Sequence, residues 1–527
     1  MLFTRRNVLQ TGAVGLAAAV RLGGPSFASE PEPQRPQVRL TTKEKFDAST
    51  IAPYRGDHAA VYKHIDANLE AHIENLRRWL RQPSVSAQNL GIREMAALVR
   101  DDLRALGFRE TEIVPTAGHP CVWGYYDAGA PKSLLVYMMY DVQPVEPADW
   151  KVPPFDAQLV EHDLGTVVMA RGAVNQKGPE RAFLNALASI IAVDGRLPVN
   201  IMIAAEGEEE LSSEHFPELF DRYEKRMRTA SSVFFPIPNQ DSRGDTAMFL
   251  GVKGILYFEL EAAGGKQGGP TKAEIHGSYK AIVDSPVWRL VQALATLTPD
   301  GNTITVPGYY DPIRPPNDEE QRLINSVISK WNDEGTRRAL GVERWVDGLT
   351  GEAAVLRLFC DTTLNIDGIW GGYTGEGSKT ILPHKATAKV DSRLVPNQRP
   401  AEALAMIRRH LDAKGFPDIR IRELGGYPPA QTSVEAPIVR SIISVYNKYG
   451  PVPSVAPRLA GSAPYYLFTE RLGLPMAMGG LGHGSGQHAP NEYLVIRSKP
   501  GSKLAGLAEM EKAYADVLYA LAGTEKA

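Results

Sequence analysis

The stretch that most constrains the fold is Leu134–Pro144, which has the sequence LLVYMMYDVQP. It is a continuous run of apolar, strand-forming residues, typical of a central parallel strand that is covered on both faces. Ligands of open α/β sheets bind near the carboxyl ends of such strands. The run therefore predicts that Asp141 lies at the edge of a functional site, although an aspartate there can also serve only as a turn residue.

The segments around this run alternate between helical and extended patterns. In order, we expect helices over 61–81 and 92–106, strands over 121–126 and 133–140, a crossover helix over 178–195 and a strand over 199–205. Alternating elements of these lengths predict an α/β fold with a doubly wound, mostly parallel sheet. At 527 residues the chain is long enough to divide into two or more domains.

Two further stretches carry residues suited to chemistry, ARGAVNQKGP at Ala170–Pro179 and AEGEEELSS at Ala205–Ser213. Together with the strand that ends at Asp141, they resemble the signatures of metallopeptidase family M20, the group of carnosinase-like dipeptidases, carboxypeptidase G and aminoacylases. The resemblance spans about Tyr62 to Leu521 and continues through residues 251–265, 363–400, 460–468 and 487–493.

The resemblance implies a zinc-peptidase-like sheet domain with an inserted α+β lid that is also the dimerisation domain. We place a leader arm at 29–60, the two parts of the catalytic domain at 61–252 and 401–527, and the lid at 253–400. The middle block looks most like the carnosinase branch. A homodimer through the lid is implied.

The first 28 residues are predicted to be a targeting segment. Arg5 and Arg6 precede a short apolar run, and a small-residue cleavage pattern ends at Ala28. This is typical of a bacterial twin-arginine signal peptide, so we expect a periplasmic or secreted protein. The apolar run is too short to span a bilayer, and we expect no stable membrane anchor.

Charge and cysteine content exclude other classes of protein. A net charge of -3 argues against nucleic acid or an anionic membrane surface as a partner. Cys121 and Cys360 do not make a disulfide framework, and we expect both to be buried as small apolar side chains.

The metal ligands are where this chain departs from the family. Relatives hold two dications that share one carboxylate, and each ion also has two ligands of its own. For the first ion these are a histidine, replaced here by Met139, and an acidic residue whose place falls near Ile237. Both of the first ion's own ligands are therefore missing.

The ligands of the second ion are retained and correspond to Glu210 and His488, whereas the shared aspartate is Asn175. An amide offers one oxygen to one cation but does not bridge two as a carboxylate does. Glu210 is then the only anionic ligand, too little charge to hold two dications close together. We therefore predict at most one zinc ion, with a coordination position left open. Complete loss of metal is the alternative.

Residues around the metal match the family better. Glu209 matches the general base, although a solvated acidic run would look the same. Asp141 matches the aspartate that orients the missing histidine, so it needs another role, such as holding Asn175 or the Lys177 loop. His276 matches the lid histidine that reaches across the family dimer to polarise the scissile carbonyl.

The substrate-binding residues implied by the resemblance are Arg393, Gly461 and Ser462. The guanidinium of Arg393 suits a substrate carboxylate, because its fork makes two parallel hydrogen bonds. Gly461 and Ser462 fit a loop that binds the substrate's carboxylate or backbone.

Three functions remain open from the sequence. The first is a metal-dependent peptidase or amidohydrolase that cleaves a dipeptide or an N-acyl amino acid. The second is a non-catalytic relative that binds a peptide or small carboxylate in the same cleft. The third is a metal-free enzyme in which Glu209 and Asp141 carry the acid–base chemistry.

Overall fold

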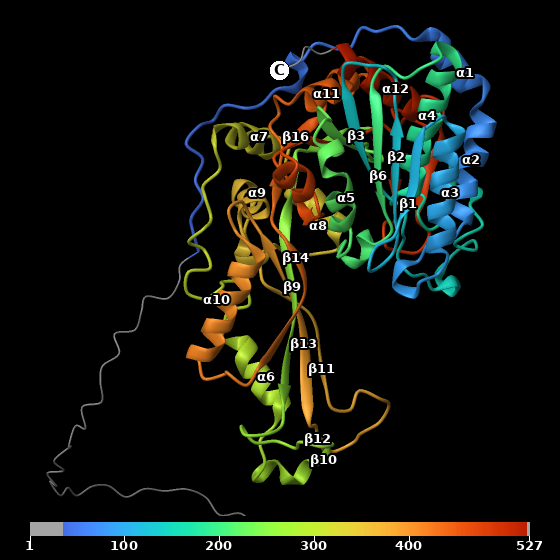
Figure 1. The fold of residues 1–527 in the computed structure, drawn as a ribbon. Coiled ribbons are helices and arrows are strands. Elements are labelled where there is room, and N and C mark those ends of the chain that lie inside the picture. Colours follow the sequence, from blue (N-terminus) through green and yellow to red (C-terminus); the bar gives the residue numbers. More distant parts are fainter. Residues whose placement is uncertain (1–34, 524–527) are drawn as a thin grey trace, which may run out of the picture.

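The computed structural model describes residues 35–523, which form a sheet domain and an elongated lid that extends away from it (Figure 1). The predicted signal peptide, residues 1–28, and the first part of the leader arm lie outside the described residues. Among the residues described, no helix is long and apolar enough to cross a bilayer.

The sheet domain is built on a six-stranded sheet in the order β1-β2-β6-β3-β7-β18. Its strands are β1 (Glu110–Val114), β2 (Cys121–Tyr126), β3 (Ser133–Met139), β6 (Asn200–Glu206), β7 (Ser232–Pro236) and β18 (Met476–Gly479). The pairs β3–β6, β3–β7 and β7–β18 are parallel, whereas β1 and β2 form an antiparallel edge. The α/β fold with a mostly parallel sheet is confirmed.

Helices cover both faces of this sheet, which explains the continuous apolar run in β3. Leu134, Val136 and Met138 point into the core beneath one set of helices, and Leu135 and Tyr137 point into the core on the other face. The helices of the domain are α1 (Ala59–Ala67), α2 (Leu69–Arg81), α3 (Ile92–Ala105), α4 (Lys177–Asp194), α5 (Pro217–Met227), α11 (Pro437–Tyr449) and α12 (Leu507–Gly523). Cys121 and Cys360 are buried free thiols, as expected.

The single helix expected over 61–81 is two helices, so this prediction was wrong. Asn68 separates α1 from α2 and has non-helical backbone angles, φ -108° and ψ 11°. Its side-chain Nδ2 donates to the carbonyl of His64 at 2.8 Å. Asparagine competes in this way with the backbone hydrogen bonds of a helix, and the apolar period alone does not reveal the break.

A second, four-stranded sheet lies beside the first and has the order β19-β20-β5-β4. Its strands are β4 (Gln158–His162), β5 (Gly165–Met169), β19 (Gly484–Ser485) and β20 (Tyr493–Ser498). Because β20 pairs with β5, the C-terminal loop between β19 and β20 lies beside the loop that follows β5. This pairing brings His488 near Asn175.

The lid contains a sheet in the order β11-β13-β9-β14. Its strands are β9 (Gly251–Ala263), β11 (Asn365–Gly371), β13 (Lys385–Leu394) and β14 (Arg420–Tyr427), and its helices are α6 (Pro286–Ala295), α7 (Asp318–Ile328), α8 (Asp333–Leu340), α9 (Gly351–Cys360) and α10 (Pro400–Ala413). A short hairpin of β10 (Ile275–His276) and β12 (Ile381–Leu382) forms the far tip (Figure 1).

The return to the sheet domain, which we expected near Ala401, comes later. Strand β14 pairs with β9, and Ala403, Ile407 and Leu411 of α10 are buried in the core of the lid. The boundary therefore lies after Tyr427. Short strands follow at the junction: β15 (Ala430–Gln431) and β17 (Leu459–Ser462) pair with the start of β9, and β16 (Ser454–Ala456) pairs with β8 (Ala247–Phe249).

A buried arginine joins the lid helices to this junction. Arg458 is 2% exposed and forms an ion pair with Glu320 of α7. It also donates from Nη2 to Gln431 Oε1 at 2.6 Å and from Nη1 to the carbonyl of Phe359 at 2.9 Å. One side chain therefore connects α7, the end of α9 and β15.

We expect the Arg458→Ala variant to lose about 3–5 kcal/mol of free energy of unfolding, because Glu320 stays buried without this partner. The matched control is Arg440→Ala, which removes an exposed pair with Glu435 and should change stability by less than about 0.5 kcal/mol. Urea titration of both variants checks this, and equal losses would contradict the assigned role.

Candidate metal and catalytic site

The site lies at the carboxyl ends of β3 and β6. Asp141 follows β3, and the short 3-10 helix Glu209–Leu211 follows β6. The fully buried Asp141 accepts hydrogen bonds from the backbone N–H groups of Glu209 and Glu210, both at 3.1 Å. Its role is therefore to fix the turn that carries the glutamate pair. The role we expected, holding Asn175 or the Lys177 loop, is not the one that its hydrogen bonds indicate.

The three predicted metal ligands lie together. Glu210 Oε1 accepts a hydrogen bond from Asn175 Nδ2 at 2.8 Å, and Glu210 Oε2 lies 3.2 Å from His488 Nε2. Asn175 Nδ2 lies 3.3 Å from the same histidine nitrogen. Gln143, which the sequence did not single out, donates to Glu210 Oε2 at 2.8 Å. The hydrogen bond with Glu210 raises the pKa of His488, so that a cation has to compete with a proton at this imidazole.

The distances among these three side chains are shorter than those in a tetrahedral zinc site. Ligand atoms around tetrahedral zinc stand about 3.3–3.6 Å apart, given bonds of about 2.0–2.2 Å, whereas Asn175 Nδ2, Glu210 and His488 Nε2 lie 2.8–3.3 Å apart, as hydrogen-bonding groups do. Turning the Asn175 amide over presents its oxygen in place of its nitrogen. Within residues 35–523, however, no group of three or more His, Cys, Asp or Glu side chains is placed to hold a metal ion.

The positions that would serve the first ion are apolar. Met139 is 3% exposed and belongs to the core cluster that also contains Leu135 and Tyr137. Ile237, just after β7, packs against the same cluster. Both side chains pack in or against the apolar core, so neither position offers an imidazole or a carboxylate to the first ion.

Glu209 lies within a group of carboxylates. Burial raises its pKa well above the ordinary value, and the charges of Glu210, Asp141 and Glu206 raise it further. Burial, and then the charge of Glu210, likewise raise the pKa of Asp141, to about 7. Glu206 is held by hydrogen bonds from the Tyr137 hydroxyl at 2.7 Å and from Ser213 Oγ at 3.0 Å. A carboxylate with a raised pKa binds a proton more strongly, which suits Glu209 to act as a base.

A carboxylate that sequence reasoning missed holds the Asn175 loop. The fully buried Glu492 accepts hydrogen bonds from the backbone N–H groups of Gly172, Val174 and Asn175 at 2.9–3.0 Å. It also pairs with the buried Arg171 at 2.7 Å. Glu492 stands in the 487–493 stretch that carried the family resemblance, and this was the available signal.

The predicted substrate residues also lie together, at the base of the lid. Arg393 Nη1 donates to Ser462 Oγ at 3.0 Å, and Gly461 precedes that serine in β17. Arg393 and Tyr427 both pair with Ile255 of β9, one from each neighbouring strand. Burial raises the pKa of Tyr427, the charge of Glu209 raises it further, and the charge of Arg393 lowers it.

His276 lies apart from these groups within one chain. It sits on the β10–β12 hairpin at the far tip of the lid (Figure 1), where Nδ1 contacts Ser278 Oγ at 2.8 Å and Nε2 contacts Thr380 Oγ1 at 3.5 Å. The structure therefore gathers five of the nine predicted site residues at the strand ends and three at the base of the lid, and it leaves His276 apart from both groups.

Comparisons with known proteins agree on one family. The peptidase dimerisation domain of family M20 matches residues 250–418. The chain is 28% identical to the Beta-Ala-His dipeptidase of Rattus norvegicus over 68% of this chain and 75% of that protein. It is 27% identical to the Cys-Gly metallodipeptidase DUG1 of Candida albicans, over 80% of this chain and 90% of that one.

A solved structure is also similar over most of the chain. The M20 family metallo-carboxypeptidase Sso-CP2 from Sulfolobus solfataricus is 33% identical, with a TM-score of 0.76. The alignment covers 86% of this chain and 98% of that structure.

We expect Glu492→Ala to lower the free energy of unfolding by about 3–5 kcal/mol, because Arg171 and three backbone N–H groups lose their buried acceptor. Glu70→Ala, which removes an exposed partner of Arg497, is the control and should have little effect. Chemical unfolding followed by circular dichroism measures both. A Glu492→Ala protein as stable as the control would rule out the assigned role.

Proposed function

The chain belongs to the M20 family of metallopeptidases, and we propose that it hydrolyses a dipeptide or an N-acyl amino acid with one zinc ion. The ion is held by Glu210, His488 and Asn175. The observation that carries this proposal is the turn at Glu209 and Glu210, which Asp141 fixes through both backbone N–H groups. A base and a metal ligand are thus held side by side, next to two further ligand side chains.

The residues of this chain divide the reaction between them. Glu209 takes the proton from the attacking water and passes it to the leaving amine, a transfer for which its raised pKa is suited. Arg393 and Ser462 hold the substrate's carboxylate and so orient the scissile bond towards Glu209. A divalent cation at Glu210, His488 and Asn175 supplies Lewis-acid polarisation of the scissile carbonyl when bound.

The protein acts as a homodimer through the lid in this proposal. Support comes from the dimerisation-domain match and from exposed apolar residues on the lid, among them Ile366, Ile369 and Trp370, which are 45–48% exposed. His276 of the partner subunit then has a route to the substrate that the same chain's lid does not provide. The twin-arginine segment, residues 1–28, supports export to the periplasm or secretion.

We expect elemental analysis of the exported protein to find one divalent cation per protomer. Glu210→Ala and His488→Ala should each lose it, since each removes one of three ligands. His384→Ala is the matched control. The backbone oxygen of this histidine accepts a hydrogen bond from Gly264 N in the lid, so its replacement should leave the metal content unchanged.

A double substitution tests the proposed number of one cation per protomer. Adding Met139→His and Asn175→Asp together should leave one ion, because Ile237 still offers no carboxylate. Two ions in this double variant would show that the missing acidic ligand has been misplaced.

Glu209→Gln should lower kcat by about a thousandfold or more and leave cation content and substrate binding unchanged, because only the proton acceptor is removed. Steady-state kinetics with dipeptides and N-acyl amino acids, together with calorimetric binding, measure the two effects. Glu214→Gln, an exposed change in the same segment, is the control.

The pH profile adds a second readout. Glu209 must be ionised to accept a proton, and its pKa is raised, so activity increases with pH through a limb above the ordinary glutamate value of about 4.3. A limb at or below that value would show that another group is the base.

One observation favours a different function, that of a binding protein without metal. Asn175 and Gln143 both direct amide nitrogens towards Glu210. Their hydrogen bonds stabilise the carboxylate without a cation. A protein without metal and without turnover, but with affinity for small peptides, would establish this second function.

A further inference from the structure

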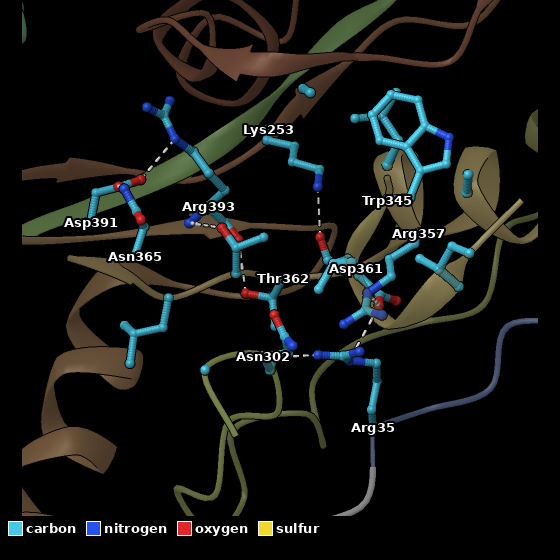
Figure 2. Close-up of a pocket in the computed structure, with 18 of the residues that line it drawn as sticks. Arg35, Lys253, Asn302, Trp345, Arg357, Asp361, Thr362, Asn365, Asp391 and Arg393 are labelled. Carbon is cyan, nitrogen blue, oxygen red and sulfur yellow. Dashed lines mark hydrogen bonds and ion pairs between the residues drawn. The ribbon is translucent and has the colours of Figure 1, made fainter. Parts of the chain in front are cut away.

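A cavity of about 660 Å³ lies against the lid sheet and is called the lid cavity here. It is bounded by Arg35 of the leader arm, by α8 and α9, by strands β11 and β13, and by Ala460 of β17 (Figure 2). Pockets for small ligands occupy about 300–1,000 Å³, so the lid cavity has room for a large side chain.

The lid cavity opens beside the residues that hold the substrate's carboxylate. Arg393 lines it and donates to Ser462, and Ala460 lies two residues before that serine. Figure 2 shows Arg393 and Asp391 on one side of the cavity and Trp345 on the other. Across β9, Tyr427 stands level with Arg393. Because Arg393 lines the lid cavity, a side chain on the carbon that carries this carboxylate can extend into it.

One wall of the lid cavity is apolar and exposed. Leu340, Val346 and Leu358 line it and are 64%, 40% and 39% exposed. Covering such surface with an apolar ligand is favourable, and contiguous exposed apolar walls mark binding sites.

Two tryptophans make this wall rigid before any ligand arrives. The indole nitrogens of Trp331 and Trp345 both donate to Asp333 Oδ1 at 2.7 Å, and their ring centroids are 6.2 Å apart. Pre-organised aromatic walls lose little entropy on binding.

The charged side chains that line the lid cavity already have ion-pair or hydrogen-bond partners within the chain, and Asp367 Oδ1, for example, accepts from Asn365 Nδ2 at 2.9 Å. Lys253 Nζ donates to the carbonyl of Asp361 at 2.6 Å, and the Asp361 carboxylate lies within 3.4–3.5 Å of Arg35 and Arg357. Arg393 is paired with Asp391 at 2.9 Å. A charged ligand side chain would have to displace one of these partners, whereas a neutral apolar one would not.

We propose that the lid cavity receives the side chain of the substrate's C-terminal residue and selects large aliphatic and aromatic side chains. The proposal rests on the peptidase function above and adds the class of substrate to it. A second copy of the chain is the other occupant to consider. The continuity with Arg393, which lines the cavity and donates to Ser462, favours the substrate.

The test uses a substitution on α9 that makes the lid cavity narrower. Ala354 lines it, whereas Ala353, on the same helix, is exposed and does not. We expect Ala354→Phe to lower kcat/KM for Ala-Trp and Ala-Leu by at least about tenfold and to leave Ala-Gly unchanged. Ala353→Phe should leave all three unchanged. Equal losses on all three dipeptides, or no loss on any, would overturn the proposal.

A binding measurement separates this proposal from the proposed function. Calorimetry with free tryptophan and glycine should show that the unmodified chain prefers tryptophan and that Ala354→Phe loses this preference, whether or not the protein turns over dipeptides. If no dipeptide is cleaved, the function fails while a tryptophan preference still supports the lid cavity. Equal binding of both amino acids overturns the proposal.

Light scattering on both variants tests whether a second copy of the chain occupies the lid cavity. A changed mass for Ala354→Phe with unchanged selectivity would assign the lid cavity to an interface between chains, and the proposal would fall. An unchanged mass with altered selectivity supports it.

Discussion

The site depends on the hydrogen bonds that stabilise a group of buried carboxylates at one edge of the sheet. Asp141 receives two backbone N–H groups, Glu206 receives a tyrosine and a serine hydroxyl, and Glu210 receives two side-chain amides and an imidazole. Glu209 is left with the charge of its neighbours and a raised pKa. Without these donors the edge of the sheet would hold several unpaired charges, each costly to bury.

The resemblance implies that Asn175 replaces an aspartate that bridges two ions in the family. This replacement removes one negative charge from the group. An aspartate beside Glu210 would repel it unless cations lay between them, whereas the amide of Asn175 bonds to Glu210 directly. The turn thus keeps its shape with or without a cation. The family resemblance also implies that Met139 and Ile237 stand where the first ion's own ligands would be. Neither apolar side chain supplies the negative charge that such an ion would need.

Much of this could be predicted from the sequence where local pattern decides the structure. The apolar run of β3 gave its bounds closely because both of its faces are buried, and the motifs placed Glu209, Glu210, Asn175 and His488 together. The break at Asn68 was missed because one side-chain hydrogen bond overrides a helical period. The lid boundary was misplaced because only strand pairing assigns β14 to the lid.

The roles of Asp141 and Glu492 could not be predicted for a related reason. Each acts through hydrogen bonds with backbone groups far away in the chain, and spacing in the sequence carries no information about such partners. The tight contact of Glu492 with the Asn175 loop shows that a motif can contain a residue that positions a ligand rather than being one.

The separation of tasks between the two parts of the chain follows from the same geometry. Residues that move protons and hold a cation sit at the strand ends of a rigid sheet, where their positions are fixed by backbone hydrogen bonds. The lid cavity is lined instead by residues of helices α8 and α9 and of the lid strands, all of which belong to the inserted block. Substitutions on those helices change which side chain is accommodated without disturbing the carboxylates, so the chain can alter its substrate independently of its chemistry.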